Sequence, residues 1–159
     1  MSFATAYVGL GANLGDPAKT LGQALETLAQ TPGVLSVRAS RLYRSDPVEA
    51  PGPAYINAVA RITTTLAPLP LLEALRTIET QFGRERHFRN APRTLDLDLL
   101  TYDKLEFSTP TLTVPHPRMH LRAFVIKPLI ELAGQDAVIN GQTLEQWLAA
   151  CLNQPCVLA

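Results

Sequence analysis

The sequence predicts a single α+β domain over residues 1–159, in which a β-sheet packs against helices. At 159 residues the chain has the usual size of one domain. Hydrophobic residues make up 47% of it and charged residues 18%, which excludes an intrinsically disordered protein. The spacing of its apolar residues changes in the order strand, helix, strand, strand, helix, strand. This order, followed by additional C-terminal helices, is typical of a ferredoxin-like βαββαβ sandwich.

The first half of the chain contains three predicted strands and one helix. The apolar run at residues 4–10 predicts a buried strand. Asp16 before Pro17 is a typical helix start, and the leucines after it recur every three or four residues, as on one face of a helix. Apolar and polar residues then alternate and predict a strand from residue 35 to about residue 44. Residues 55–66 are rich in β-branched side chains and predict a third strand.

The second half of the chain contains the second helix, over residues 71–82, and a strand over residues 94–102. We expect the helices to cover one face of the sheet and loops to surround the other. The C-terminal part adds a helical region over 122–133 that Pro128 should kink or split, a turn at Asn140-Gly141, and a helix over 143–152.

Composition narrows the classes of function. The chain has 14 Lys+Arg and 14 Asp+Glu, so its formal net charge is zero, which argues against nucleic-acid and anionic-membrane partners. No apolar run reaches the roughly 18–20 residues of a membrane span, and no secretion signal is evident. Cys151 and Cys156 are the only cysteines; we expect two reduced thiols rather than a zinc site. These features predict a cytoplasmic protein and, we expect, a monomer.

A glycine-rich segment, G-L-G-A-N-L-G at residues 9–15, separates the first strand from the first helix. Its third glycine comes one residue too late for the G-x-G-x-x-G turn of dinucleotide-binding proteins, and no Walker A sequence occurs. We interpret residues 11–15 as a tight turn that needs glycine for its backbone, or as a turn that approaches a ligand.

The most informative segment lies between residues 84 and 100. It closes on a predicted strand in which Asp96 and Asp98 alternate with leucines. Residues two apart on a strand share a face and lie about 6.5–7 Å apart, so the two carboxylates stand side by side. Oxygen ligands of this kind fit Mg²⁺, which usually takes one or two carboxylates together with water and substrate phosphates. The arginines that precede them would neutralise a phosphate chain; they are Arg84, Arg86, Arg89 and Arg93.

A plainer interpretation of the same segment is a solvated acidic strand edge after an exposed basic loop. Four arginines directly before the two aspartates favour the metal and phosphate interpretation, because arginine is the cation suited to phosphate oxygens. Farther along, His116 lies between prolines, and Arg122 starts a predicted helix, where a cation is favoured only if an anion is near. Tyr55 and Asn57 share one face of a predicted strand. The residues alone leave open whether His116 and Tyr55 are structural or contact a ligand.

These motifs resemble those of the 6-hydroxymethyl-7,8-dihydropterin pyrophosphokinase family. The family signature is matched by R-N-A-P-R-T-L-D-L-D-L-L at residues 89–100. Shorter matches follow the same order along residues 6–147: G-L-G-A-N-L-G, Y-R-S-D-P, Y-I-N-A, T-V-P-H-P-R-M and R-A-F. The resemblance implies a ferredoxin-like fold, two Mg²⁺ ions, and transfer of pyrophosphate from ATP to the hydroxymethyl group of 6-hydroxymethyl-7,8-dihydropterin in folate biosynthesis.

The resemblance also implies roles for individual residues. Asp96 and Asp98 would bind the metal ions and, with Arg86 and Arg93, form the catalytic group. The residues expected at the nucleotide are Glu79, Arg86, Arg93, Thr113, His116 and Arg122. Those expected at the pterin are Gly11, Ser45, Val48, Tyr55, Asn57 and Phe124. The chain departs from the family pattern at Asp46, Asn90, Thr111 and Pro117, where the family carries proline, tryptophan, arginine and an aromatic residue.

Two other functions remain as alternatives. Another two-metal nucleotidyl or phosphoryl transferase on a ferredoxin-like fold would share the paired carboxylates. An RNA-binding sandwich would need stacking aromatic residues and a basic surface, which 6% aromatics and zero net charge do not supply.

Overall fold

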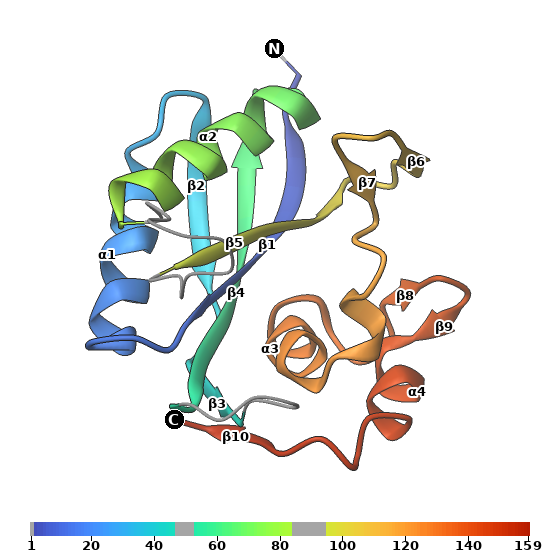
Figure 1. Ribbon diagram of the computed structural model, residues 1–159. Helices are drawn as coiled ribbons and strands as arrows, with labels where there is room; N and C mark the ends of the chain where they lie inside the picture. Colours follow the sequence, from blue (N-terminus) through green and yellow to red (C-terminus); the bar gives the residue numbers. More distant parts are fainter. Residues whose placement is uncertain (1, 47–52, 84–94) are drawn as a thin grey trace.

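The protein is seen in a computed structural model that describes residues 2–46, 53–83 and 95–159. Its centre is a 6-stranded antiparallel sheet of order β10-β3-β4-β1-β5, in which β2 also pairs with β4 (Figure 1). The strands are β1 (Ala4–Ala12), β2 (Val34–Ala39), β3 (Tyr43–Ser45), β4 (Tyr55–Thr64), β5 (Asp96–Tyr102) and β10 (Cys156–Leu158). The order β2-β4-β1-β5, with a helix in each crossover, confirms the predicted ferredoxin-like fold.

The helices lie on both faces of this sheet. α1 (Pro17–Ala29) and α2 (Pro68–Gln81) cover the first face, and α3 (Ala123–Ala133) packs on the second face against β4 (Figure 1). The expectation that helices cover only one face of the sheet is therefore wrong. α3 has an apolar side, and it buries this side against the second face of the sheet. The smaller elements are η1 (Met119–Leu121), α4 (Leu144–Ala149), and the hairpins β6 (Phe107–Ser108)–β7 (Thr113–Val114) and β8 (Val138–Ile139)–β9 (Gln142–Thr143).

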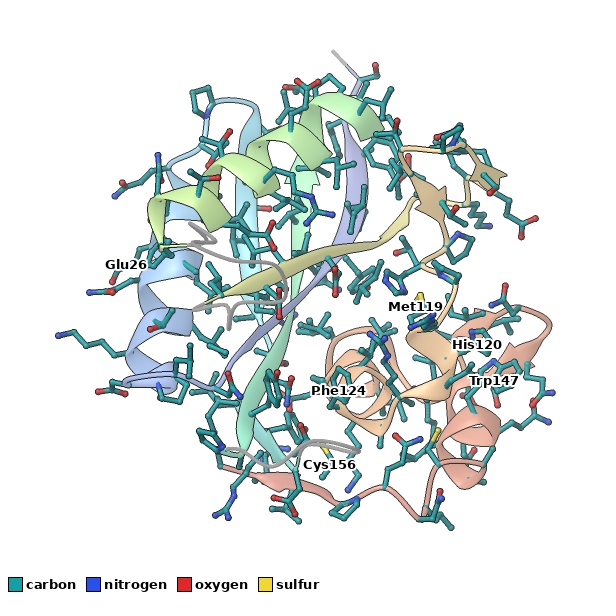
Figure 2. The ribbon with its side chains drawn as sticks, in the orientation of Figure 1. Glu26, Met119, His120, Phe124, Trp147 and Cys156 are labelled. Carbon is teal, nitrogen blue, oxygen red and sulfur yellow. The ribbon has the colours of Figure 1, made fainter. Side chains whose placement is uncertain are left out.

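Two apolar cores lie on the two faces. The first core buries the even-numbered residues of β1 from Ala4 to Ala12 against leucines of α1 and α2. The second core joins Val59 and Leu100 of the sheet to the apolar side of α3 and to α4. Its outer end includes an edge-to-face contact of His120 with Trp147 (Figure 2). The alternation of β1 therefore directs its odd-numbered residues, including two glycines, to the second face.

Several predicted elements have different limits in the structure. β1 continues through Ala12, so Gly11 belongs to the strand rather than to a turn. The strand expected from 35 to 44 is divided into β2 and β3, because Ser40 exchanges hydrogen bonds with Val59 through its backbone N–H and its hydroxyl. α3 is not split at Pro128, which is buried in the helix, so packing outweighs one lost backbone hydrogen bond.

The C-terminal part shows the remaining differences. α4 ends at Ala149, three residues before the predicted end. The turn at Asn140-Gly141 is confirmed, with φ of 49° and 80° inside the β8–β9 hairpin. β10 was not predicted; it pairs with β3 and covers that edge of the sheet. In the three described stretches of the chain, every helix is too short or too polar to cross a membrane.

Candidate active site

A cavity of about 320 Å³ lies between the second face of the sheet and the start of α3. Figure 2 shows Phe124, one of its lining residues, on α3 across from the strands. Residues from six separate segments of the chain meet around it. Nine of the predicted site residues line this cavity: Gly11, Ser45, Tyr55, Asn57, Asp96, Asp98, His116, Arg122 and Phe124.

The two predicted metal-binding carboxylates lie opposite glycines of β1. The register of β1 and β5 pairs Asp98 with Gly9 and Asp96 with Gly11. Both aspartates are half-buried, while Leu97 between them is fully buried in the first core. The glycines place no side chain beside the carboxylates, and this lets other side chains approach: a Cβ added at Gly9 would meet Leu100 at 3.5 Å, and one added at Gly11 would meet Asn57 Oδ1 at 3.2 Å.

Asp98 and His116 influence each other's ionisation. Burial raises the pKa of Asp98 above its usual value, and the nearby His116 and Arg122 oppose this effect. Burial lowers the pKa of His116, against the attraction of Asp98. The Nδ1 of His116 accepts a hydrogen bond from the backbone N–H of Arg118 at 3.1 Å. The neutral ring therefore has its proton on Nε2, which can donate to an anionic ligand.

Arg122 and Phe124 belong to the first turn of α3. The backbone carbonyl of Arg122 accepts the N–H groups of Val125 and Ile126 at 3.0 Å and so starts the helix. The guanidinium carbon lies 5.5 Å from the centre of the Phe124 ring, within the range of a cation–π contact. A cation and an aromatic face are thus presented together to the cavity.

The polar edge of the cavity is formed by neighbouring strands. Asn57 on β4 donates from Nδ2 to the hydroxyl of Ser45 on β3 at 2.7 Å, and both side chains are buried. Tyr55, two residues earlier on β4, is half-buried and lines the same cavity. A donor and acceptor edge beside an aromatic ring suits a flat ligand that carries its own hydrogen-bonding edge.

A second cavity, of about 200 Å³, shares Asp98 and His116 with the first. It brings in Thr113 of β7 and two positions where the chain departs from the family pattern, Thr111 and Pro117. A ligand that occupied both cavities would pass the carboxylate of Asp98. The arrangement therefore allows two ligands to meet beside the paired aspartates.

Four predicted site residues remain, and only Glu79 among them belongs to the described part of the chain, where it lines neither of these two cavities. Val48, Arg86 and Arg93 lie outside the described residues, as do the other two arginines of the basic segment. Glu79 is 1% exposed; its Oε2 accepts the backbone N–H of Leu97 at 2.9 Å and its Oε1 accepts from Arg76 at 2.8 Å. The structure thus places Glu79 between α2 and β5.

Among the lining residues that were not predicted as site residues, three bear on the chemistry of the site. Gly9 lies opposite Asp98, and its signal was a second glycine two residues before Gly11 on the same strand face. Asp46 follows Ser45 at the cavity rim, and Arg76 lines the second cavity. Arg76 gave no sequence signal, because an exposed arginine on an amphipathic helix is ordinary.

The donors at the site fit a hard cation. Asp96 and Asp98 supply oxygen ligands only, which is the chemistry that Mg²⁺ prefers. Within residues 2–46, 53–83 and 95–159, no group of three or more His, Cys, Asp or Glu side chains could bind a metal by itself. The pair therefore fits an ion that takes its other ligands from a substrate and water, rather than a closed structural metal site.

Paired carboxylates, a histidine and an arginine around two cavities that share lining residues fit the class of a group-transfer enzyme with a phosphate-bearing substrate. Comparison with known proteins identifies the family. Residues 7–134 match the family described as 7,8-dihydro-6-hydroxymethylpterin-pyrophosphokinase (HPPK).

Curated relatives agree with this match. A 2-amino-4-hydroxy-6-hydroxymethyldihydropteridine pyrophosphokinase of Pseudomonas aeruginosa is 44% identical over 146 residues, covering 91% of this chain and 90% of the relative. The enzyme of the same name from Haemophilus influenzae is 43% identical over 143 residues, covering 89% of each chain. The chain therefore belongs to the HPPK family. The predicted activity, pyrophosphoryl transfer from ATP to hydroxymethyldihydropterin in folate biosynthesis, is confirmed at the level of the family.

Solved structures show the same fold at low sequence identity. An HPPK-DHPS crystal structure in complex with substrates superposes with a TM-score of 0.76 at 10% identity. Plasmodium falciparum HPPK-DHPS with pteroate gives a TM-score of 0.75 at 11% identity. Each match covers 96% of this chain but only 44% or 43% of the solved chain, so the chain spans less than half of these proteins.

Proposed function

We propose that this pyrophosphokinase transfers the pyrophosphoryl group of ATP with the help of two Mg²⁺ ions bound at Asp96 and Asp98. The observation that carries the proposal is that nine residues expected from the sequence surround one cavity, with both aspartates on its wall. Bound Mg²⁺ would neutralise the phosphate chain and align it for in-line displacement. The chain's own residues then bind, orient and shield the two substrates.

The second cavity and its shared wall form the nucleotide side of the site. Thr113 lines this cavity, and His116, whose Nε2 is left to donate to a phosphate oxygen, lines both cavities. Arg122 adds a cation there, and Arg86 and Arg93 would supply two more to the triphosphate. Preorganised cations of this kind stabilise charge that develops during transfer, typically by about 2.7–4 kcal/mol for one contact.

The first cavity forms the pterin side. Tyr55 and Phe124 offer aromatic faces to a flat ring, and Asn57 offers a polar group to its edge, with Ser45, Val48 and Gly11 as the remaining expected contacts. In the reaction, the hydroxymethyl oxygen attacks the β-phosphorus of ATP and loses its proton. The bond between that phosphorus and the oxygen bridging to the α-phosphate breaks, and AMP leaves.

The proposal is tested by incubating the protein with ATP, MgCl₂ and 6-hydroxymethyl-7,8-dihydropterin. AMP and the pterin diphosphate are the expected products. Inorganic pyrophosphate with a nucleotidylated product would instead support the alternative, a two-metal nucleotidyl transferase. Activity that persisted in excess EDTA would contradict the metal assignment.

We also propose that residues 1–159 act as one domain and as a monomer in the cytoplasm. The two apolar cores share one sheet, which supports a single folding unit. Size-exclusion chromatography with light scattering tests the monomer, for which the sequence mass is 17.3 kDa.

A further inference from the structure

The backbone of Leu97 is bound on its outer side by two side chains of α2. Its N–H donates to Glu79 Oε2 at 2.9 Å, and its carbonyl accepts from Arg76 Nη1 at 3.3 Å. The same Nη1 also donates to Glu79 Oε1 at 2.8 Å. Two hydrogen bonds thus join one residue of β5 to two helical side chains three residues apart, and a third hydrogen bond joins these two side chains as an ion pair.

The position of β5 in the sheet explains why these contacts matter. In the described sheet β5 is the last strand, with β1 as its only strand neighbour. Alternate residues of an antiparallel strand bond to the same neighbour, so the N–H and C=O groups of Leu97 face away from β1. Edge groups of this kind otherwise need water or another strand. Glu79 and Arg76 take the place of that missing strand.

Leu97 is also the residue between the two aspartates. Its side chain is fully buried in the first core, so Asp96 and Asp98 project from the opposite face into the cavity. Any shift or twist of the backbone at Leu97 would change the spacing and direction of both carboxylates. Two carboxylates that share metal ions repel each other when the metal is absent, so the strand needs a restraint there.

We infer that Arg76 and Glu79 form a clamp on the Leu97 backbone that sets the geometry of Asp96 and Asp98. Glu79 is then a positioning residue and not a nucleotide contact. This inference rests on the proposed metal site. It agrees with the general behaviour of groups that orient metal ligands, whose loss typically lowers metal affinity about 10–100-fold.

The test compares Glu79→Ala and Glu79→Gln with Glu73→Ala, a matched control that removes an exposed glutamate from the same helix. Thermal melts first establish that each variant is folded. If the alanine variant does not fold, the glutamine variant is used in its place, because its side chain keeps one acceptor for the Leu97 N–H. Mn²⁺ affinity is then measured by electron paramagnetic resonance with a non-hydrolysable ATP analogue. We expect about 10–100-fold weaker Mn²⁺ binding in the alanine variant, a smaller loss in the glutamine variant, and none in the control.

Two further measurements separate positioning from direct nucleotide contact. Amide exchange of Leu97, followed by NMR without metal or nucleotide, should accelerate in both Glu79 variants, because each weakens the charge-assisted bond to its N–H. Affinity for the ATP analogue in EDTA should stay unchanged. Weaker analogue binding in EDTA with unchanged Leu97 exchange would overturn the inference in favour of a nucleotide contact.

Asp98→Ala distinguishes failure of the inference from failure of the proposed function. If Asp98→Ala binds Mn²⁺ as the unmodified protein does, the metal site itself is wrong and the inference fails with it. If Asp98→Ala loses Mn²⁺ but Glu79→Ala binds it normally, the metal site stands and the clamp alone is refuted.

Discussion

Asn57 and Ser45 join β4 to β3 through a 2.7 Å hydrogen bond inside the cavity wall. Because Nδ2 of Asn57 donates to Ser45, Oδ1 is directed toward Gly11. A Cβ atom added to Gly11 would lie 3.2 Å from this oxygen. The pair therefore fixes which end of the amide meets a ligand. A ligand whose edge carries an N–H group can donate a hydrogen bond to Oδ1 of Asn57.

The first prediction concerns this pair. Ser45→Ala leaves the amide of Asn57 without its buried partner, so we expect pterin binding to weaken by about 1–3 kcal/mol. Asn57→Ala should weaken it at least as much, and nucleotide affinity should be retained in both variants. Calorimetry with pterin, Mg²⁺ and an ATP analogue measures the change, with the exposed Ser36→Ala as control. Unchanged pterin affinity in Ser45→Ala would contradict the polar edge described here.

The second prediction concerns Asp98→Asn. Losing one metal-binding oxygen should reduce turnover about 100-fold or more, on the scale of one lost electrostatic contact in a transition state. Burial raises the pKa of Asp98, so its ionised form costs stability at neutral pH. The variant should therefore melt at a higher temperature than the unmodified protein at pH 7. Near-normal turnover in Mg²⁺ would refute the metal assignment.

The pH dependence of that stabilisation has a definite sign. A carboxyl whose folded pKa is raised binds protons more readily in the folded state, so its cost appears only as pH rises above the unfolded value of about 3.9. The melting difference between Asp98→Asn and the unmodified protein should shrink as pH falls toward that value. Metal-free melts from pH 7 to about pH 3.5 test this; a difference that grows in acid contradicts it.

The third prediction concerns Gly11→Ala. The new Cβ would lie 3.2 Å from Asn57 Oδ1, closer than ordinary van der Waals contact, so the amide must shift. We expect weaker pterin binding with little loss of folding. Gly22→Ala is the matched control, because its Cβ meets nothing within 4 Å in the middle of α1. This control should raise the free energy of unfolding by about 0.5–1 kcal/mol and leave pterin affinity unchanged.

The fourth prediction concerns β10, which holds β3 at the edge of the sheet. Val157 pairs with Arg44, and the next pair along, Cys156 with Ser45, reaches the cavity wall. Val157→Pro removes a backbone donor from this ladder, so we expect lower stability and weaker pterin binding. Val157→Ala keeps the donor and loses only an exposed side chain, so both quantities should change little. Equal effects of the two substitutions would argue against a role for strand pairing.

The fifth prediction concerns Glu131 on α3. It accepts hydrogen bonds from the backbone N–H of Arg41 at 2.8 Å and from the Tyr43 hydroxyl at 2.7 Å. Burial raises its pKa, but these bonds and the Arg41 guanidinium together bring it below the usual value. A lowered carboxyl pKa stabilises the fold above the unfolded pKa of about 4.3, and this is lost as pH falls through the folded pKa.

Glu131→Gln should therefore lower the free energy of unfolding at pH 7, and the difference should vanish in acid. Urea unfolding at pH 7 and at about pH 3 measures it. Glu26→Gln serves as control, since Glu26 is exposed on the outer side of α1 (Figure 2). A difference that persists unchanged at low pH would show that charge is not the cause.

The elements that the sequence predicted are those determined by residues close together in the chain, such as a helix cap or the alternation of a strand. α1 was predicted because Asp16 caps it, with Oδ1 accepting from Lys19 N–H at 3.3 Å, and because its leucines form one stripe. The paired aspartates were predicted because strand alternation is local. β10 was missed because it pairs with β3, more than a hundred residues away in the chain. Pro128 inside α3 shows tertiary packing outweighing a local rule.

The site was predicted to the extent that residue types and a family resemblance could define it. The glycines opposite the aspartates and the rim position of Asp46 depend on strand register, which the sequence does not give. The burial of Glu79 against Leu97 depends on how α2 lies along β5. The resemblance alone placed Glu79 at the nucleotide, whereas its contacts with the backbone are visible only in three dimensions.

The separation of the two cores by one sheet bears on how this enzyme can be engineered. The first face consists almost wholly of aliphatic side chains, and the cavity with its polar groups opens on the second face. Aliphatic side chains of similar volume can replace one another at modest cost. Libraries that vary α1 and the strand residues beneath it should therefore yield thermostable variants with unaltered substrate affinity. In α2, Leu72, Arg76 and Glu79 should be kept, because they line the second cavity or bind the Leu97 backbone. Conversely, substitutions that relieve inhibition by a compound that fills the first cavity must come from the second face, where the same residues serve the substrate.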